Sequence, residues 1–390
     1  MRLGVLFNHD TLHQVAHCAP IAVELLRSYP DIEISILTSS AAQESLVRAI
    51  ITRAGVPMPA FVRLGVPPGI ELADRFLGKV APLRRVAVLR ANLEAFRGLD
   101  ALMAPESTCA LLKTRFGLDG LRLIHSRHGA GDRSIGFKPV SRVFDLVLVA
   151  GEKIRQRLLA ESLVREDNCK VVGYAKFDLV GMEDSGLRLF HNGNPTVLYN
   201  PHPDPTLSSW FDWGEAVLDL FTRRPDLNLI FAPHVMLFQR RLHTSLEKLR
   251  VRWRRRLDEK YLKHANIHVD LGSTNCIDMT YTRAADIYMG EASSQVYEFI
   301  VTPRPCLFLN PRRLAWEGDR NFSHWRFGEV VDRLDGLEAA IDRAPAGFPA
   351  FEPVQREALA RTFDISGEPA SVRAARTVAD FLGHPPRRGA

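Results

Sequence analysis

Two histidines of the sequence directly follow short apolar runs, where the end of a strand can hold a reactive side chain. His128 follows LRLIHS within RHGAGD, and His234 follows LNLIFAP. An imidazole has an ordinary pKa near neutrality, so it can take a proton from an attacking hydroxyl or donate one to a phosphate oxygen. We therefore predict His128 as a general base and His234 as a donor to a leaving group. Asp132 is predicted to orient His128 or to replace it as the base.

A serine pair in GEASSQVYEF has the chemistry needed to hold a diphosphate and a ribose. Ser293 and Ser294 precede a predicted helix, whose first N–H groups and partial positive charge attract a phosphate. Gly290 lets the backbone approach a ligand, and Glu298 is a natural partner for ribose hydroxyls. A purely structural alternative stays open, because a serine cap with Gln295 and Glu298 as capping partners has the same sequence.

A third polar segment, PHPDPTLSSW, follows the apolar run TVLYN and is expected to close over the phosphates. The predicted donor-binding residues are Gly129, Asn200, His202, Ser208, Ser209, Gly290, Ser293, Ser294, Gln295 and Glu298.

Three further histidines recur every four residues near the start of the chain, at His9, His13 and His17. On one helix they would share a face, as metal ligands can, but NHDTLHQ follows the first strand as a loop. We predict no metal site and no cofactor, and assign this loop to the acceptor hydroxyl or its phosphate. The sequence also lacks GxGxxG after a strand, GxxxxGK[ST], GxSxG and a DxD pair at a strand end, which argues against dinucleotide oxidoreductases, phosphate-loop NTPases, α/β-hydrolases and metal-clamped nucleotide-sugar sites.

The elements that must position these residues alternate between short apolar strands and helices, the pattern of parallel sheets covered on both faces. We predict an α/β fold of two Rossmann-like, doubly wound domains that face a cleft, with residues 1–180 as acceptor domain, 181–195 as linker, 196–368 as donor domain and 369–390 as a C-terminal helix and tail. Ligands bind at the carboxyl ends of such strands, so His128 and the amides around Ser293 and Ser294 should face one groove. The predicted strands are 3–7, 32–37, 101–105, 121–126, 144–151, 196–200, 227–233, 267–270, 286–290 and 305–310, and helices are predicted at 19–29, 41–54 and 371–384.

Composition is that of a globular protein, with 46% hydrophobic and 25% charged residues in 390. No apolar run approaches the roughly 20 residues of a membrane-spanning helix, and the first residues read as a strand, not a signal peptide. Five scattered cysteines favour reduced thiols in the cytoplasm. The net charge of +6 indicates anionic partners other than nucleic acid. RVRWRRR, residues 250–256, is predicted as part of a long helix that is either a solvated face or a peripheral contact with anionic lipid at the inner membrane face.

The chain resembles the CDP-glycerol glycerophosphotransferases of wall teichoic acid synthesis, mainly between residues 121 and 310. The resemblance lies in RHGAGD, APHVML and DMTYTRAADIYMGEASSQVYEFIVTPRPCLFLN. It implies the GT-B architecture, a base at His128, donor phosphate contacts at His234, and a diphosphate and ribose site at 285–299. In this chain Glu291-Ala292 stands where the family has Asp-Tyr, and Ala-Gly-Asp follows the His-Gly step in place of Thr-Pro-Leu-Lys.

These features together predict a transferase of cell envelope biosynthesis. It would move glycerophosphate or a related polyol phosphate from a CDP-linked donor to a hydroxyl of a lipid-linked or glycan acceptor. Two alternatives stay open: a glycosyltransferase or epimerase that uses a UDP-sugar, and a non-catalytic module that binds a nucleotide or an anionic polymer. The sequence does not indicate an oligomeric state.

Overall fold

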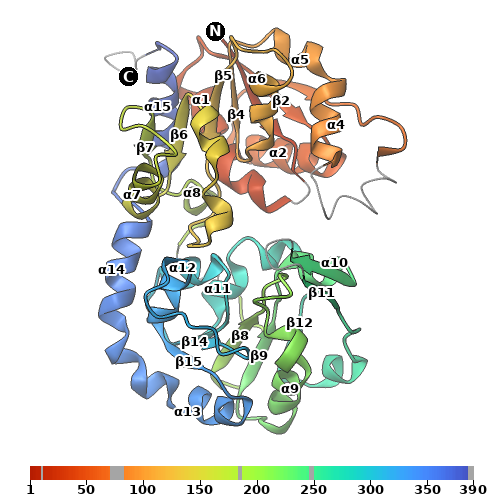
Figure 1. The fold of residues 1–390 in the computed structure, drawn as a ribbon, viewed down its shortest axis with the longest axis vertical. Coiled ribbons are helices and arrows are strands. Elements are labelled where there is room, and N and C mark those ends of the chain that lie inside the picture. The colour runs from red at the N-terminus through yellow and green to blue at the C-terminus, as the bar shows by residue number, and fades with distance from the viewer. Residues whose placement is uncertain (10–11, 71–82, 183–186, 246–249, 385–390) are drawn as a thin grey trace. The chain divides into compact units, whose positions relative to one another are not determined.

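The computed structural model describes residues 1–9, 12–70, 83–182, 187–245 and 250–384. The chain forms two compact units, each of which contains a parallel sheet (Figure 1). The first unit consists of residues 1–130, 137–181 and 360–390, and the second consists of 131–136 and 182–359. The predicted α/β class with two doubly wound domains is confirmed. Part of the predicted linker, residues 183–186, lies outside the described residues.

The first unit is built on a seven-stranded sheet in the order β3-β2-β1-β4-β5-β6-β7, in which all neighbouring strands are parallel. Its strands are β1 (Arg2–Phe7), β2 (Glu33–Thr38), β3 (Ala60–Arg63), β4 (Ala101–Ala104), β5 (Arg122–Ser126), β6 (Leu146–Val149) and β7 (Cys169–Val171). Its helices are α1 (Val15–Ser28), α2 (Ala41–Ala54), α4 (Leu83–Ala91), α5 (Leu93–Arg97), α6 (Leu111–Thr114), α7 (Glu152–Ala160), α8 (Lys176–Val180) and α15 (Ala370–Phe381).

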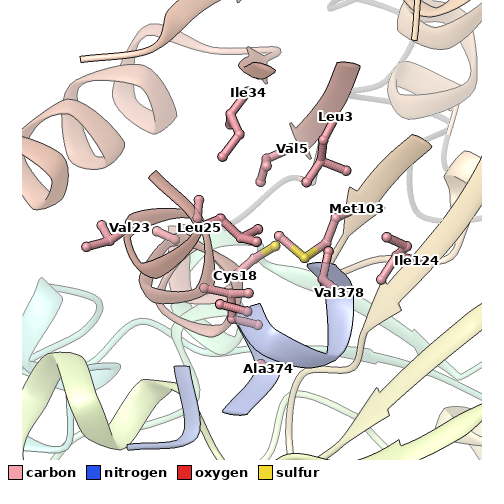
Figure 2. Packing of buried hydrophobic residues seen from close by; sticks show 14 of the residues in the cluster. Leu3, Val5, Cys18, Val23, Leu25, Ile34, Met103, Ile124, Ala374 and Val378 are labelled. Atoms are coloured by element: carbon pink, nitrogen blue, oxygen red, sulfur yellow. The ribbon is translucent and has the colours of Figure 1, made fainter. Parts of the chain in front are cut away.

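Apolar side chains cover both faces of the central strands of the first sheet, which explains why β4 (ALMA) and β6 (LVLV) are uninterrupted apolar runs. Figure 2 shows one of the two core clusters, in which side chains of α1 and α15 meet those of the strands. The labelled members are Leu3, Val5, Cys18, Val23, Leu25, Ile34, Met103, Ile124, Ala374 and Val378. The second cluster includes residues of α4, α6 and α7, among them Val88, Leu112 and Leu158. The buried faces of the helices therefore hold the strand ends, and the residues after them, in fixed positions.

The second unit repeats this topology in a six-stranded parallel sheet, in the order β12-β9-β8-β13-β14-β15 (Figure 1). Its strands are β8 (Thr196–Asn200), β9 (Asn228–Phe231), β12 (Ile267–Val269), β13 (Ile287–Gly290), β14 (Cys306–Leu309) and β15 (Glu329–Val331). Its helices are α9 (Trp210–Arg223), α10 (Val235–Gln239), α11 (Thr280–Ala284), α12 (Gln295–Phe299), α13 (Leu337–Gly347) and most of α14 (Glu352–Thr362). In both units the order of strands reverses beside the first strand, between β1 and β4 and between β8 and β13.

The arginine-rich segment is not a helix, which corrects the prediction for residues 250–256. Its first part is β11 (Arg250–Trp253), which pairs antiparallel with β10 (Leu242–Ser245). The pattern in RVRW has a period of two, which suits a strand. Arg252 is paired with Asp212 at 2.8 Å, whereas the Trp253 side chain is 70% exposed.

The end of the chain packs on the first unit, although the sequence suggested a donor domain that extends to residue 368. The Asp364 amide donates to the Ala150 carbonyl at 2.9 Å, and the Ser371 amide donates to the Asp178 carboxylate at 2.6 Å. The alanine-rich face of α15 then joins the core beside α1. In the described parts of the chain no helix is long and apolar enough to cross a membrane. All five cysteines are buried free thiols.

Candidate functional site

The carboxyl ends of β8, β9 and β13 bring together most of the donor-binding residues predicted from the sequence. Asn200 and Gly290 are register partners in adjacent strands. The amide of His234, after β9, donates to the carbonyl of Pro201 at 3.0 Å. A Cβ at Gly290 would lie 2.7 Å from the Tyr288 hydroxyl and 3.0 Å from the Asn200 carbonyl, so only glycine fits there. This edge is the reversal point of the sheet, where open α/β sheets bind ligands.

His202 and His234 form a pair at this edge, with ring centroids 5.8 Å apart. Nδ1 of His234 accepts a hydrogen bond from the Met236 amide at 3.3 Å, which places the proton of the neutral ring on Nε2. Burial lowers the pKa of His234 to about 4, so the ring is neutral at pH 7. Its Nε2–H is therefore a hydrogen-bond donor of the kind that suits a phosphate oxygen.

Glu291 organises the loop between β8 and α9, a role that the sequence did not reveal. Its two carboxylate oxygens accept hydrogen bonds from the amide of His202 at 2.9 Å and of Ser209 at 2.6 Å. The residue is 1% exposed, and burial raises its pKa from 4.5 to about 7, although these amides and Arg312 oppose the rise. The signal in the sequence was the departure from the Asp-Tyr of the resembling family.

The serines of this edge have structural partners. Ser208 and Ser209 are fully buried: Ser208 Oγ accepts from the Trp210 amide at 3.3 Å, and Ser209 Oγ lies 2.7 Å from the Tyr199 hydroxyl. These bonds fix the start of α9, so the structure gives both hydroxyls a structural role in place of the predicted ligand contact.

The turn before α12 is compatible with both interpretations of its sequence, a helix cap and a phosphate-binding turn. Ser293 Oγ accepts from the Gln295 amide at 3.2 Å, which is a cap, while Ser294 makes no side-chain cap bond. Gln295 Nε2 donates to the Cys276 carbonyl at 2.8 Å, and Glu298 is buried at 5% exposure. Because this helix has only five residues, its dipole is small. A phosphate at this turn would therefore be bound by Ser293 and Ser294.

Asp132 has a structural role in the second unit, and its predicted role beside His128 stays a prediction. Its carboxylate accepts from the Tyr297 hydroxyl at 2.9 and 2.7 Å, and from Nδ1 of His324 at 2.9 Å. His324 Nε2 in turn donates to the Glu291 carbonyl at 2.7 Å. The sequence could not indicate this network, because His324 lies 192 residues beyond Asp132.

His128 stands after β5 in the first unit with a fixed tautomer. Its Nδ1–H donates to the Pro105 carbonyl at 2.6 Å, so the lone pair lies on Nε2, where it accepts a hydrogen bond from Nε2 of Gln14 at 3.2 Å. Crowding by protein atoms lowers its pKa below 6.5, opposed by the Pro105 bond, although the residue remains exposed to solvent. Gly129 follows with φ 75°, a conformation that favours glycine.

The other early histidines lie near His128. Ring centroids of His13 and His17 are 6.0 and 6.1 Å from that of His128. His17 is in α1, His13 is in a short 3-10 helix (Leu12–Gln14) and His9 precedes it, so they do not share one helix. Within the described ranges, no group of three or more His, Cys, Asp or Glu side chains could hold a metal ion.

Four polar residues of this region were not predicted from the sequence: Asn8, Gln14, Arg85 and Glu106. None of them is a histidine, glycine or serine within a recognisable motif. Asn8 directly follows β1, and Glu106 comes after β4, the neighbour of β1 in the sheet. Asn8 Nδ2 donates to the Arg85 carbonyl at 3.0 Å, and the Arg85 guanidinium lies 3.9 Å from Glu106. With Gln14 they surround the reversal point of the first sheet. The polar residues that interrupt apolar runs, as in LFNHD and LMAPES, were the available signal.

Comparison with known proteins supports the architecture. No family model matches the sequence, and no curated protein matches it. The MnaA–UDP co-structure from S. aureus is similar over 100% of both chains, with a TM-score of 0.63 and 14% identity. The UDP-GlcNAc 2-epimerase of Neisseria meningitidis, bound to UDP-GlcNAc, has a TM-score of 0.59 at 14% identity, over 98% of this chain and 99% of the other. The wall teichoic acid polymerase TagF, soaked with CDPG, has a TM-score of 0.58 at 10% identity, over 98% and 87%.

The chain has the GT-B fold. At these identities the likeness shows the fold alone, and it covers the whole chain, including the first 120 residues, for which the sequence offered no motif. The predicted architecture is thereby confirmed.

Proposed function

We propose that this chain is a transferase that moves glycerol phosphate, or a related polyol phosphate, from a CDP-linked donor to a hydroxyl group of a lipid-linked or glycan acceptor. The observation that carries the proposal is the tautomer of His128. With Nδ1–H bound to the Pro105 carbonyl, the Nε2 lone pair faces the Gln14 amide at 3.2 Å, and it accepts a proton once the acceptor hydroxyl replaces that amide. The resemblance of RHGAGD and of residues 285–299 to the glycerophosphotransferases agrees with it.

In the proposed reaction, the acceptor hydroxyl gives its proton to Nε2 of His128 while its oxygen attacks the β-phosphorus of the donor. The bond from that phosphorus to the bridging oxygen breaks, and CMP leaves with the electron pair. His234 supplies a neutral Nε2–H to a phosphate oxygen as negative charge grows on the leaving group. Asn200 and His202 join the edge that holds the donor.

A donor screen tests this function. CDP-glycerol, CDP-ribitol, UDP-GlcNAc and UDP-glucose are compared by thermal shift, because a ligand at 100 times its Kd stabilises a protein by about 2.7 kcal/mol. Mass spectrometry of the nucleotide released with a polyol-phosphate acceptor then identifies the reaction. Release of CMP supports polyol-phosphate transfer, release of UDP supports glycosyl transfer, and binding without release indicates a non-catalytic nucleotide-binding module.

The role of His128 has its own test. We expect His128→Ala to lower kcat by roughly 100-fold or more, as the loss of a general base does, while the Kd for the donor stays within about twofold. His191→Ala, at an exposed histidine, is the matched control and should retain full turnover. An unchanged kcat for His128→Ala would remove this residue from the mechanism.

A UDP-sugar enzyme is the second candidate, favoured by the full-length likeness to structures that contain UDP or UDP-GlcNAc. The donor screen separates the two candidate functions, because a CDP-linked donor carries cytosine whereas a UDP-sugar carries uracil. Turnover of UDP-GlcNAc without any acceptor would support an epimerase.

A further inference from the structure

Each unit carries an asparagine and a glutamate at the reversal point of its sheet: Asn8 and Glu106 in the first unit, Asn200 and Glu291 in the second. Asn8 directly follows the first strand of its unit and Asn200 is the last residue of the first strand of the other, and they are 0% and 1% exposed. Each side-chain amide donates to a backbone carbonyl, of Arg85 at 3.0 Å and of Ala232 at 2.6 Å. Each side-chain oxygen is buried without a hydrogen-bond partner among the described residues. In both units, therefore, a buried asparagine oxygen is held in place without a hydrogen-bond donor among the described residues.

The carboxylates of the two pairs differ in what they bind. Glu291, after β13, uses both oxygens on backbone amides of its own unit. Glu106, after β4, uses Oε2 on the Thr108 amide at 2.5 Å, and its Oε1 is buried with no partner in the described part of the chain. The residue is 3% exposed. The second unit thus uses its carboxylate to hold a loop, whereas the first unit leaves one carboxylate oxygen open.

Two more buried groups beside this carboxylate have no protein partner among the residues that the structure describes. Both ring nitrogens of His9 lack one, and so does Oε1 of Gln14. Gln14 lies 3.2 Å from His128, and His9 follows Asn8, which is bonded to Arg85, the residue 3.9 Å from Glu106. Leaving a buried polar group unpaired costs about 1–3 kcal/mol, and proteins rarely do so without a ligand or water.

We propose that this region of the first unit binds an uncharged polyhydroxyl group, the terminal polyol of the acceptor, through Asn8, His9 and Glu106. Among the buried atoms without a partner in the described part of the chain are three oxygen acceptors and one neutral imidazole, which offers one donor and one acceptor. Hydroxyl groups complement such a set, because each can donate to an oxygen and accept from the ring N–H. The description of this group as the acceptor rests on the proposed function, while the binding itself does not.

The Arg85 guanidinium lies 3.9 Å from the Glu106 carboxylate, so the two charges of the region offset each other and favour neither an anion nor a cation. A neutral polyol can donate to the oxygens of Asn8, Gln14 and Glu106 and accept from the ring N–H of His9. Its bound hydroxyl would stand near Gln14, whose side chain neighbours His128.

Saturation-transfer NMR on the nucleotide-free full chain tests the inference with ribitol, glycerol and glycerol 3-phosphate as probes. We expect ribitol and glycerol to receive saturation, and glycerol 3-phosphate to bind through its hydroxyl end or more weakly. Glu106→Gln can keep the Thr108 bond through its carbonyl oxygen while it turns the open acceptor into a donor. It should weaken ribitol binding by roughly 10-fold or more, as loss of a hydrogen bond to a charged group does.

Asn8→Ala removes the second oxygen and should weaken ribitol binding by several-fold, whereas Glu94→Gln, at a side chain 81% exposed in the same unit, is the matched control and should not change it. Circular dichroism confirms that each variant is folded. No saturation of any polyol, or equal ribitol affinity in Glu106→Gln and the unmodified protein, would overturn the inference. Because the measurement needs no nucleotide and no turnover, it can succeed or fail independently of the donor screen.

Discussion

The carboxylate of Glu291 should make the stability of the second unit depend on pH. Burial raises its pKa from 4.5 to about 7, so the folded state favours the protonated form. A raised carboxyl pKa contributes stability at low pH that is lost as the pH rises from about 4.5 through about 7. At about 1.36 kcal/mol per pKa unit, the loss between pH 4 and pH 8 is about 3 kcal/mol.

Glu291→Gln isolates this contribution because glutamine does not titrate. The variant keeps one oxygen for an amide of the 200–209 loop and sets an NH2 group against the other, a penalty of about 1–3 kcal/mol that does not change with pH. We therefore expect the variant to be the less stable protein at pH 5. As the pH rises to 8, the difference between the two proteins should move by about 2.5 kcal/mol in favour of the variant, because part of the loss has already occurred at pH 5.

Tryptophan fluorescence measures this selectively, since all five tryptophans, at 210, 213, 253, 316 and 325, lie in the second unit. Urea unfolding of both proteins is followed at pH 5, 6, 7 and 8, with Glu317→Gln at an exposed position as control. A difference between Glu291→Gln and the unmodified protein that stays constant within about 0.5 kcal/mol from pH 5 to 8 would refute a buried carboxylate with a raised pKa.

Three further changes probe the second unit. Asp132→Asn should destabilise it by about 1–3 kcal/mol, because buried donors of His324 and Tyr297 lose a carboxylate acceptor, and Tyr297→Phe should cost less; equal stability of Asp132→Asn in urea unfolding would contradict the network. Gly290→Ala should cost about 1–3 kcal/mol by overpacking, and Tyr288→Phe in the same chain should recover part of it, which a double-mutant cycle measures. Trp253→Ala should reduce sedimentation with anionic vesicles at low salt if the exposed β11 contacts lipid; no binding of the unmodified protein would exclude that contact.

Local features of the sequence were sufficient to predict most of the elements. The helix at 41–54 was predicted with the observed bounds, because its ends are local: the Ser40 side chain accepts from the Gln43 amide at 3.2 Å, and Gly55 takes φ 65°. Strands such as 196–200 were equally clear, since both of their faces are buried and their residues are apolar throughout. The strands β3, β7 and β15 were missed, because three or four partly exposed residues give too little pattern.

The predicted candidates of the second unit converge because residues after strands share one edge of a parallel sheet, a rule that needs no coordinates. That rule placed His202, His234 and Gly290 together from their positions in the sequence. It could not distinguish ligand-facing side chains from those already bonded within the protein, as Ser208 and Ser209 are.

Only the tertiary structure decided which partner each buried polar group has. Asp132 is bound to Tyr297 and His324, Glu291 holds the 200–209 loop, and Glu106 keeps one oxygen unpaired. These outcomes depend on which strands are neighbours and on which loops meet, often between residues more than 80 positions apart. Hydrophobic periodicity is a short-range property of the chain, whereas satisfaction of a buried hydrogen bond is a property of the assembled packing. For this reason the sequence by itself determined the elements and the edge that carries the candidate site, and the packing determined which side chains remain free for a ligand.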